Sequence, residues 1–297
     1  MPSDSLVETP LVVQQPSEIR TAVQRLREDG ARLGLVPTMG ALHEGHLSLV
    51  DAAREECDRV AVSIFVNPTQ FGEGEDFAAY PRDLAADVSR LAERGVDLVF
   101  APQAADIYRP GHDTTVTVGD LAARFEGQFR PHHFPGVATI VLKLLQLMPA
   151  QVAFFGQKDY QQSLVVRRMV TDLNVPIEIR TCPTIREVDG LAKSSRNVYL
   201  SADERSQAAA IWQALQLAAR EVTGGNTHSA DIVAAMRGQL RAAGIDDIDY
   251  VALADAETLR PVPEIVGRTV ALVAVRLGPT RLIDNHLLEP PASYWAP

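Results

Sequence analysis

The sequence predicts an α/β protein with a Rossmann-like, doubly wound parallel sheet and a smaller C-terminal α+β domain. Two observations predict this fold class. Over residues 1–186, apolar and β-branched runs alternate with helix-like segments, and the runs lack the polar alternation of half-exposed strands, which favours a parallel sheet covered on both faces. Over residues 187–297 the order changes to two helices followed by three strands, which is typical of an α+β domain.

The elements of the first domain follow from local spacing. Residues 1–16 show no periodicity and are expected to form a loosely held lead-in. Ile19, Val23 and Leu26 recur at helical spacing and predict a helix over residues 17–29. Five strands are expected, at residues 32–38, 59–66, 96–101, 152–155 and 177–184, and the run at 59–66 is continuously β-branched and apolar. Four further helices are expected between these runs, at residues 46–56, 84–94, 136–148 and 156–173.

The rest of the chain is less uniform. Residues 103–135 carry scattered glycine, proline and histidine and show no regular pattern. In the C-terminal domain, Ser201 and Glu204 form a capping-box pattern, which predicts that a helix begins there and continues to Val222. A second helix is expected at residues 229–243, and three strands are expected at residues 248–252, 269–277 and 281–288.

Composition narrows the class of protein. With 46% hydrophobic and 22% charged residues, the 297-residue chain has the composition of a soluble globular protein. A formal net charge of −10 argues against a nucleic-acid partner, whose phosphates require a basic surface. No apolar run approaches the ~20 residues that span a bilayer, and the first residues lack a secretory signal, so we expect a cytoplasmic protein. Cys57 and Cys182 are interpreted as inert small hydrophobes.

The strongest functional signal lies at residues 35–49, where a strand passes through a glycine turn into a helix. A helix start presents unpaired N–H groups and a partial positive charge, which attract phosphate. His43 and His46 are three residues apart, so both imidazoles lie on one face of the first turn and can reach one phosphoryl group. We interpret the stretch as a nucleotide phosphate site. The alternative is an ordinary strand-turn-helix connection that contains a glycine and two histidines by chance.

Other polar segments follow the ends of predicted strands. Ligands of open α/β sheets bind outside the carboxyl ends of the strands, where the strand order reverses. The candidate segments lie at this predicted edge, at residues 39–46, 67–70, 156–159 and 184–186. This coincidence favours a functional site over a chance pattern.

Two groups of cations adjoin the same edge. Lys158 lies at the start of the helix after the fourth predicted strand, where it can add a movable positive charge beside a second helix end. Lys193 and Arg196 share a loop with two serines at the domain boundary, where the loop can close over a nucleotide. A solvated surface lysine and a solvated turn are the respective alternatives.

Weaker candidates are polar side chains near this edge. Gln70 and Gln162 have the chemistry to orient a small polar substrate, although either glutamine alone is more typical of a surface. Arg130 and the two adjacent histidines form a weakly supported carboxylate site. Asp87 either approaches a metal ion on the phosphates or lies on a helix surface, and we favour the helix surface.

Four blocks of sequence, in this order, resemble the pantothenate synthetase (pantoate-β-alanine ligase) family. The blocks are Pro37-Thr38-Met39-Gly40-Ala41-Leu42-His43-Glu44-Gly45-His46, Phe65-Val66-Asn67-Pro68-Thr69-Gln70-Phe71, Gly156-Gln157-Lys158-Asp159-Tyr160-Gln161-Gln162 and Ser194-Ser195-Arg196-Asn197. The likeness covers nearly the whole chain and includes residues 276–278 and 280–285. It implies a homodimer that condenses pantoate with β-alanine to pantothenate through a pantoyl-adenylate intermediate, consuming ATP and releasing AMP and pyrophosphate.

The resemblance also implies roles for individual residues. His46 would be the proton donor, and Gln70 and Gln162 would bind pantoate and β-alanine. From their own chemistry, His43 and Lys158 are expected to act in catalysis with His46. The implied ATP-binding residues are Met39, Gly40, Ala41, Leu42, His43, Glu44, Gly45, His46, Gly156, Gln157, Lys158, Asp159, Ile185, Lys193, Ser194, Ser195 and Arg196. The first domain, 1–186, would then bind ATP and pantoate, and the second, 187–297, would serve as a lid.

The sequence departs from the family pattern at two positions. Gln157 stands where the family usually has Glu, and Lys193 stands where an apolar residue is common. His43, His46 and Lys158 would stabilise charge on the α-phosphate, with Mg²⁺ bound through the phosphates of ATP; no protein ligand to the metal is assigned. Two alternatives stay open at this point: a nucleotidylyltransferase that releases its adenylylated product, and a nucleotide-sensing protein without turnover.

Overall fold

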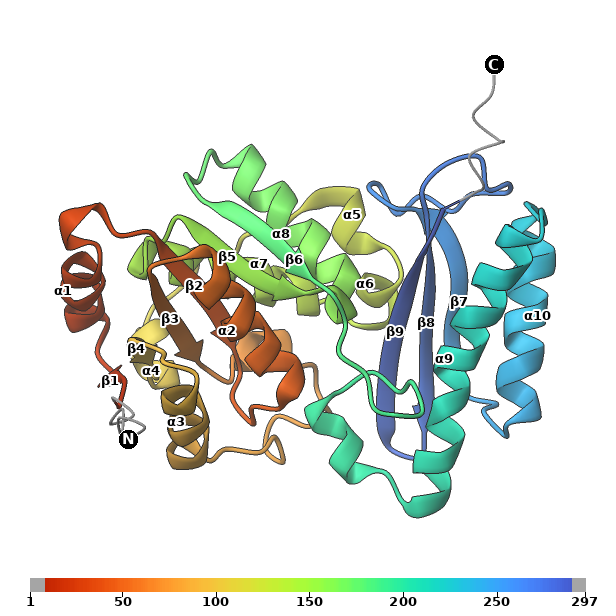
Figure 1. Ribbon diagram of the computed structural model, residues 1–297, viewed down its shortest axis with the longest axis horizontal. Coiled ribbons are helices and arrows are strands. Elements are labelled where there is room, and N and C mark those ends of the chain that lie inside the picture. The colour runs from red at the N-terminus through yellow and green to blue at the C-terminus, as the bar shows by residue number, and fades with distance from the viewer. Residues whose placement is uncertain (1–8, 290–297) are drawn as a thin grey trace, which may run out of the picture. The chain divides into compact units, whose positions relative to one another are not determined.

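Six parallel strands form one sheet in the first part of the chain (Figure 1). The computed structural model describes residues 9–289, and the strands are β1 (Leu11–Val13), β2 (Leu33–Thr38), β3 (Arg59–Ile64), β4 (Leu98–Phe100), β5 (Val152–Gly156) and β6 (Glu178–Cys182). They lie in the order β1-β4-β3-β2-β5-β6. From β2 the chain winds outward through β3 and β4, and then in the opposite direction through β5 and β6. This arrangement confirms the doubly wound parallel sheet.

Helices bury both faces of this sheet. The covering helices are α1 (Pro16–Leu26), α7 (His133–Leu147) and α8 (Tyr160–Asp172) on one face, and α2 (Glu44–Glu56) and α3 (Leu84–Glu93) on the other. Leu35 and Val36 of β2 belong to opposite apolar clusters, as do Phe155 and Phe154 of β5. Successive side chains of a strand alternate between faces, and both faces are apolar at the central strands β2, β3 and β5, so these strands are largely apolar runs in the sequence.

Three details differ from the expectations. The expected lead-in contains β1, which pairs with β4 through Leu11 and Leu98, while residues 1–8 lie outside the described part. The first helix begins at Pro16 and not at Ser17, because the fixed φ of proline suits the first helical position. The region without a pattern holds three short helices, α4 (Ala104–Ile107), α5 (Gly119–Ala123) and α6 (Glu126–Phe129). Short 3₁₀ turns are η1 (Glu28–Gly30), η2 (Pro68–Gln70) and η3 (Gln157–Asp159).

The C-terminal part is a three-stranded antiparallel sheet covered by two helices, which lie side by side in Figure 1. Its elements are η4 (Ser195–Tyr199), α9 (Ala202–Thr223), α10 (Ser229–Ala242), β7 (Ile248–Asp255), β8 (Thr269–Leu277) and β9 (Thr280–Leu288). The predicted capping box is confirmed, because Ser201 and Glu204 exchange side chain-to-backbone hydrogen bonds at the start of α9. The smaller α+β region is therefore present as expected.

The turn after β5 belongs with the C-terminal part of the chain. Residues 1–156 and 162–183 form one compact unit, whereas residues 157–161 and 184–297 form the other. The segment expected to open one long helix at residue 156 is instead the 3₁₀ turn η3, followed by α8. The second unit thus contains η3 and the first two residues of α8.

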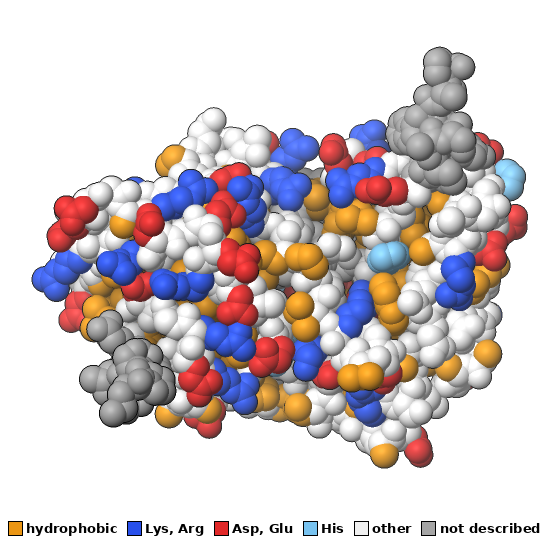
Figure 2. All heavy atoms as spheres, viewed as in Figure 1, with side chains coloured by type: hydrophobic (Ala, Val, Ile, Leu, Met, Phe, Trp, Pro, Cys, Tyr) orange, Lys and Arg blue, Asp and Glu red, His pale blue; other side chains and the backbone are white. Residues whose placement is uncertain are grey.

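The surface carries mixed charge. On the face shown in Figure 2, Lys and Arg side chains are interspersed with Asp and Glu side chains. One such network lies beside the edge strand β6, where Glu56 pairs with Arg32 at 3.0 Å and with Arg180 at 2.9 Å. Charges of this kind discourage an edge strand from pairing with another sheet.

Among residues 9–289, no helix is both long enough and apolar enough to cross a membrane.

Gly136, in the first turn of α7, provides a test of how closely this helix approaches the segment after β3. A Cβ at Gly136 would lie 2.4 Å from the carbonyl oxygen of Thr69 and 2.7 Å from the amide nitrogen of Gln70. Gly136→Ala must push backbone apart, so we expect the free energy of unfolding to fall by about 1–3 kcal/mol. Urea denaturation measures this change.

The control for that experiment is Gly238→Ala in α10, where nothing lies within 4 Å of the added Cβ. Alanine is a better helix former than glycine, so this variant should gain about 0.5–1 kcal/mol. Equal effects of the two substitutions would contradict the close approach of α7.

Candidate active site

The turn between β2 and α2 has left-handed backbone conformation at two successive residues. Gly40 has a φ of 80° and Ala41 a φ of 50°. A Cβ at Gly40 would lie 2.9 Å from Oδ2 of Asp87 and 3.1 Å from Cγ2 of Ile64. Both the conformation and the limited space therefore require glycine at position 40. The sharp turn allows α2 to begin close to the carboxyl end of β2.

A buried carboxylate fixes this turn. Asp87 of α3 accepts hydrogen bonds from the N–H of Ala41 at 2.9 Å and from the N–H of Leu42 at 2.8 Å. Arg90, on the same helix, donates to the carbonyl of Leu42. Burial raises the pKa of Asp87, and the two N–H donors oppose that rise. The prediction of a surface aspartate was wrong: only 4% of Asp87 is exposed, because its face of α3 points at the turn.

His43 and His46 cap the first turn of α2. Nδ1 of His43 accepts from the N–H of Gly45 at 3.1 Å, and Nδ1 of His46 accepts from the N–H of His43 at 3.4 Å. The two ring centroids are 4.1 Å apart. An Nδ1 that accepts a hydrogen bond carries no proton, so each neutral ring is assigned its proton on Nε2. The pair therefore combines a helix start with two imidazole Nε2–H donors.

The backbone N–H groups of this turn are used within the chain. Those of residues 40–43 and 45 all donate to nearby side chains. This differs from the expectation that unpaired N–H groups at the helix start receive phosphate. An anion bound here would be held by the imidazole groups and the helix dipole more than by these N–H groups.

The segment after β3 contacts the turn through Gln70. Nε2 of Gln70 donates to Sδ of Met39 at 3.0 Å, and Oε1 accepts from Nδ2 of Asn67 at 3.1 Å. Asn67 is buried, and its Oδ1 accepts from the hydroxyl of Tyr108 at 2.7 Å. Burial raises the pKa of Tyr108, so the hydroxyl keeps the proton that it donates. These bonds fix which end of the Gln70 amide faces Met39.

Sequence reasoning singled out Gln70 but gave Asn67 and Tyr108 no role. The available signal was Asn67 itself, an amide directly before Pro68 that caps η2 by accepting from the N–H of Thr69. Tyr108 gave no signal, because it lies in the region without a periodic pattern and reaches Asn67 only in the folded chain.

Arg130 pairs with a carboxylate of this chain. Its Nε and Nη2 donate to Glu75 at 2.7 and 2.6 Å, and Nη2 also donates to the carbonyl of Gln70 at 3.3 Å. Nδ1 of His133 contacts the same carbonyl at 3.1 Å. In this structure Glu75 thus holds the Arg130 guanidinium, and the hypothesis of a ligand carboxylate at Arg130 stays a prediction. Arg130 also supports the backbone of Gln70.

In the second unit, Lys158 is presented by a turn that is held on β9. The buried Asn285 donates from Nδ2 to the carbonyls of Gln157 and Lys158 at 2.8 and 2.9 Å. Nζ of Lys158 lies 3.5 Å from Oδ1 of Asp159, and 22% of the Lys158 side chain is exposed. The ammonium group therefore extends from an anchored 3₁₀ turn and not from a regular helix.

Arg186 anchors the segment that contains Ile185. Its guanidinium forms two hydrogen bonds to the buried Asp284, at 2.6 and 3.1 Å, and lies 3.6 Å from the ring centroid of Trp212. The carbonyl of Ile185 accepts from the N–H of Lys193 at 2.9 Å. The structure thus brings Ile185 and the start of the Lys193 loop together, as two sides of one hairpin.

The loop at residues 193–197 is ordered by its own capping bonds. Oγ of Ser194 accepts from the N–H of Arg196 at 3.3 Å and caps η4. Nδ2 of Asn197 donates to the carbonyl of Ala192 at 3.1 Å. The Lys193 ammonium pairs with a neighbouring carboxylate, Glu187, at 3.4 Å. The loop conformation therefore depends little on which side chain stands at position 193.

The sequence-predicted residues fall into two groups. In the first unit, His46 and Gln70 follow the adjacent strands β2 and β3, and Gln162 lies in the first turn of α8. In the second unit, Lys158 and Ile185 belong to segments held by β9. Because His46 and Lys158 belong to different units, their convergence on one phosphate group stays a prediction.

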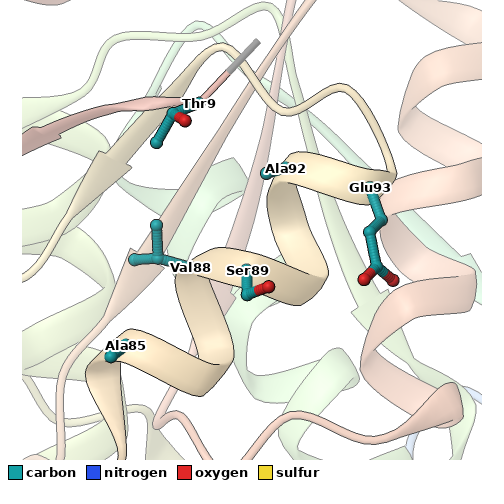
Figure 3. Close-up of a pocket in the computed structure, with 6 residues that line it drawn as sticks. All are labelled: Thr9, Ala85, Val88, Ser89, Ala92 and Glu93. Atoms are coloured by element: carbon teal, nitrogen blue, oxygen red, sulfur yellow. The ribbon is translucent and has the colours of Figure 1, made fainter. Parts of the chain in front are cut away.

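A hollow on α3 is separate from this chemistry (Figure 3). It is lined by Thr9, which precedes β1, and by five residues of α3: Ala85, Val88, Ser89, Ala92 and Glu93. Apart from Glu93 these side chains are small or apolar, so the hollow lacks the convergent polar groups of a substrate site.

Within residues 9–289, no three His, Cys, Asp or Glu side chains gather to form a metal site.

Comparison with known proteins places these features in a family context. Residues 11–287 match a family model described as Pantoate-beta-alanine ligase. The pantothenate synthetase of Roseiflexus castenholzii is 51% identical over 278 residues, covering 94% of this chain and 99% of that protein. The pantothenate synthetase of Moorella thermoacetica is 50% identical, with 94% and 98% of the two chains covered.

Solved structures agree with the sequence comparisons. The pantothenate synthetase from Thermus thermophilus matches with a TM-score of 0.90 and 47% identity, covering 94% of this chain and 100% of that chain. The pantoate-beta-alanine ligase from Francisella tularensis, complexed with beta-gamma ATP and beta-alanine, matches with a TM-score of 0.78 and 34% identity, covering 94% and 97%. The likeness covers most of both compact units.

The role of Asp87 can be tested without reference to activity. Asp87→Asn keeps the shape of the side chain but replaces one acceptor oxygen with an NH₂ group that faces a backbone N–H. We expect the amides of Ala41 and Leu42 to exchange with deuterium at least tenfold faster, since a lost buried acceptor costs about 1–3 kcal/mol. Asp83→Asn, at the N-cap of the same helix, should leave both amides protected. Unchanged exchange in Asp87→Asn would contradict the assigned role.

Proposed function

The chain belongs to the pantoate-β-alanine ligase family, and from this premise we propose that it binds and activates its substrates at the carboxyl edge of the parallel sheet. The protein is an ATP-dependent ligase that condenses pantoate with β-alanine to pantothenate through a pantoyl adenylate, releasing AMP and pyrophosphate. Family membership excludes the two alternatives, a transferase that releases an adenylylated product and a sensor without turnover.

The observation that supports this location is the reversal of winding between β2 and β5. Ligands of open α/β sheets bind outside the carboxyl ends of the strands at such a point. The His43–His46 pair follows β2, and Lys158 comes two residues after Gly156 ends β5. We therefore assign the ATP contacts to the two turns that begin at Met39 and Gly156, and to Ile185 with residues 193–196.

The first chemical step activates the carboxylate of pantoate, which is a poor electrophile. A pantoate carboxylate oxygen attacks the α-phosphorus, the bond from that phosphorus to the pyrophosphate oxygen breaks, and the mixed anhydride pantoyl adenylate forms. Negative charge grows on the α-phosphate and the leaving pyrophosphate in the transition state. The Nε2–H groups of His43 and His46 and the ammonium of Lys158 are proposed to stabilise that charge, with His46 as proton donor.

In the second step the amine of β-alanine attacks the acyl carbon. The new C–N bond forms, the bond from the acyl carbon to the AMP oxygen breaks with its electron pair on AMP, and the proton of the amine passes to solvent. This step requires mainly that the amine be oriented toward the acyl carbon, because the anhydride is already activated. Gln70 and Gln162 are proposed to hold the pantoate portion, and the bonds to Asn67 and Met39 fix the amide of Gln70 before substrate arrives.

Mg²⁺ is proposed to enter with ATP. The phosphates of ATP are proposed to supply coordinating oxygens, because Mg²⁺ prefers oxygen ligands. The ion would neutralise charge on the β and γ phosphates. We also propose that the lid role belongs to the C-terminal unit and that the protein is cytoplasmic. A homodimer is proposed because the family resemblance implies it.

The catalytic assignment leads to one test on rate. His46→Ala should lower kcat by about 10²- to 10⁴-fold, and Lys158→Ala by about 10²- to 10³-fold, because each removes a donor to developing charge. Release of pyrophosphate with ATP and pantoate gives the rate of the first step, and circular dichroism checks the fold.

The matched controls are His228→Ala and Arg168→Ala, whose side chains are exposed and are not among the proposed site residues. Both should keep normal turnover. Near-normal turnover in either test variant would remove that residue from the mechanism.

A second test concerns pantoate. Tyr108→Phe removes the hydroxyl that holds Asn67 and thereby loosens the amide of Gln70. We expect the KM for pantoate to rise about fivefold, the equivalent of one hydrogen bond of about 1 kcal/mol, with the KM for ATP unchanged. Tyr199→Phe, on a half-exposed side chain of η4 outside this network, is the control. An equal rise in both KM values would show that Tyr108 does not act through Gln70.

A further inference from the structure

The segment Thr280-Arg281-Leu282-Ile283-Asp284-Asn285 is part of the family resemblance but has no place in the reaction described so far. It forms the first six residues of β9, in the second compact unit. Two adjacent residues at its end make long-range side-chain contacts, Asp284 with Arg186 and Asn285 with the turn that carries Lys158. Both partners lie in or beside segments that we assign to nucleotide binding.

The contacts of Asn285 are unusual in where they fall on the Lys158 backbone. The Gln157 carbonyl belongs to the peptide group before the Cα of Lys158, and the Lys158 carbonyl belongs to the peptide group after it. One NH₂ group, that of Asn285, donates to both carbonyls, at 2.8 and 2.9 Å. Holding both peptide planes fixes the direction of the Cα–Cβ bond between them, and hence the direction in which the lysine side chain leaves the turn.

The turn has little means of fixing itself. η3 is a single 3₁₀ turn, an element with poor internal hydrogen-bond geometry that is stable only in short pieces. A second anchor follows it, because the hydroxyl of Tyr160 donates to the carbonyl of Ala256 at 2.7 Å. The two anchors attach the start and the end of the Lys158 turn to the second unit.

Asn285 is itself held firmly. Only 2% of the residue is exposed, its N–H donates to Oδ1 of Asp284 at 2.8 Å, and its carbonyl accepts from Arg186 at 3.4 Å. Its Oδ1 faces Nε2 of Gln157 at 3.5 Å, which leaves Nδ2 toward the two carbonyls. A rigid strand with a buried, fully bonded side chain is the kind of support that keeps a reacting group within a fraction of an ångström of its working position.

We propose that Asn285 is a positioning residue for Lys158, acting through the two peptide groups that flank the lysine. The proposal rests on the proposed function, in which the Lys158 ammonium stabilises charge on the α-phosphate. Asn285 does not touch substrate in this assignment. Asn285 also contacts Gln157, whose proposed role is ATP binding, so the effect that we assign to Lys158 is the effect on kcat at saturating ATP.

That restriction gives a sharp test, a double-mutant cycle with Lys158. Asn285→Ala should lower kcat for pyrophosphate release about 10- to 100-fold in the otherwise normal protein, because small misplacements of a reacting group have effects of that size. In a Lys158→Ala background the same substitution should change kcat by less than about twofold, since the group it positions is already absent. A merely structural role would lower kcat by the same factor in both backgrounds.

Asn226→Ala is the matched control, because this asparagine also donates from Nδ2 within the second unit, to Glu221 at 3.0 Å, but touches none of the assigned segments. It should leave kcat unchanged in both backgrounds. Thermal unfolding of every variant is followed by circular dichroism. If Asn285→Ala does not fold, Asn285→Ser, which fills more of the space and keeps a hydroxyl donor, is taken through the same cycle.

The outcomes separate the two levels of the proposal. Equal losses in both backgrounds, or no loss in either, overturn the positioning role of Asn285 and leave the role of Lys158 intact. Near-normal kcat in Lys158→Ala alone overturns the catalytic assignment of Lys158 and, with it, the positioning role. A loss confined to the background that retains Lys158 supports both.

Discussion

The path of the chain from β2 into α2 depends on the carboxylate of Asp87. Two successive residues with positive φ are costly, the more so because Ala41 carries a Cβ. Asp87 compensates by accepting from both N–H groups that the turn exposes, and it fills the space that any side chain at Gly40 would need. The same two bonds determine where α2 begins, and therefore where His43 can cap it and where the imidazole of His46 stands.

The proposed cationic and imidazole groups are presented by different structural means. The histidines belong to the helix start itself and are ordered by bonds within one turn. Lys158 lies on a short 3₁₀ turn that cannot order itself, and a strand far along the chain supplies the missing constraint through Asn285. Gln70 is an intermediate case, because it is held by the local Asn67, which the distant Tyr108 holds in turn. In each case a second layer of buried polar side chains sets the geometry of the layer that would meet substrate.

Most of the fold could be predicted because its signals are local. A strand buried on both faces is a continuous apolar run, and the Ser201–Glu204 capping box marks a helix start within four residues. β1 was not predicted, because it has three residues, of which two are exposed, and its pairing with β4 is a contact between distant parts of the chain. The assignment of residues 157–161 to the second unit was not predicted either, because it too depends on a distant contact. The asparagine that binds these residues stands 127 residues beyond Lys158.

By itself, the sequence determined the doubly wound sheet, the smaller α+β part, the family and the segments that follow the strands, because hydrophobic period, caps and contiguous motifs are all properties of neighbouring residues. Only the tertiary structure decided that Asp87 is buried against a turn, that Arg130 is occupied by Glu75, and that Asn285 holds the carbonyls on either side of Lys158. Each of these is a hydrogen bond between residues far apart in the chain. The sequence does not distinguish a solvated polar side chain from a buried one. Only the tertiary packing that excludes water from the side chain shows which group becomes its hydrogen-bond partner.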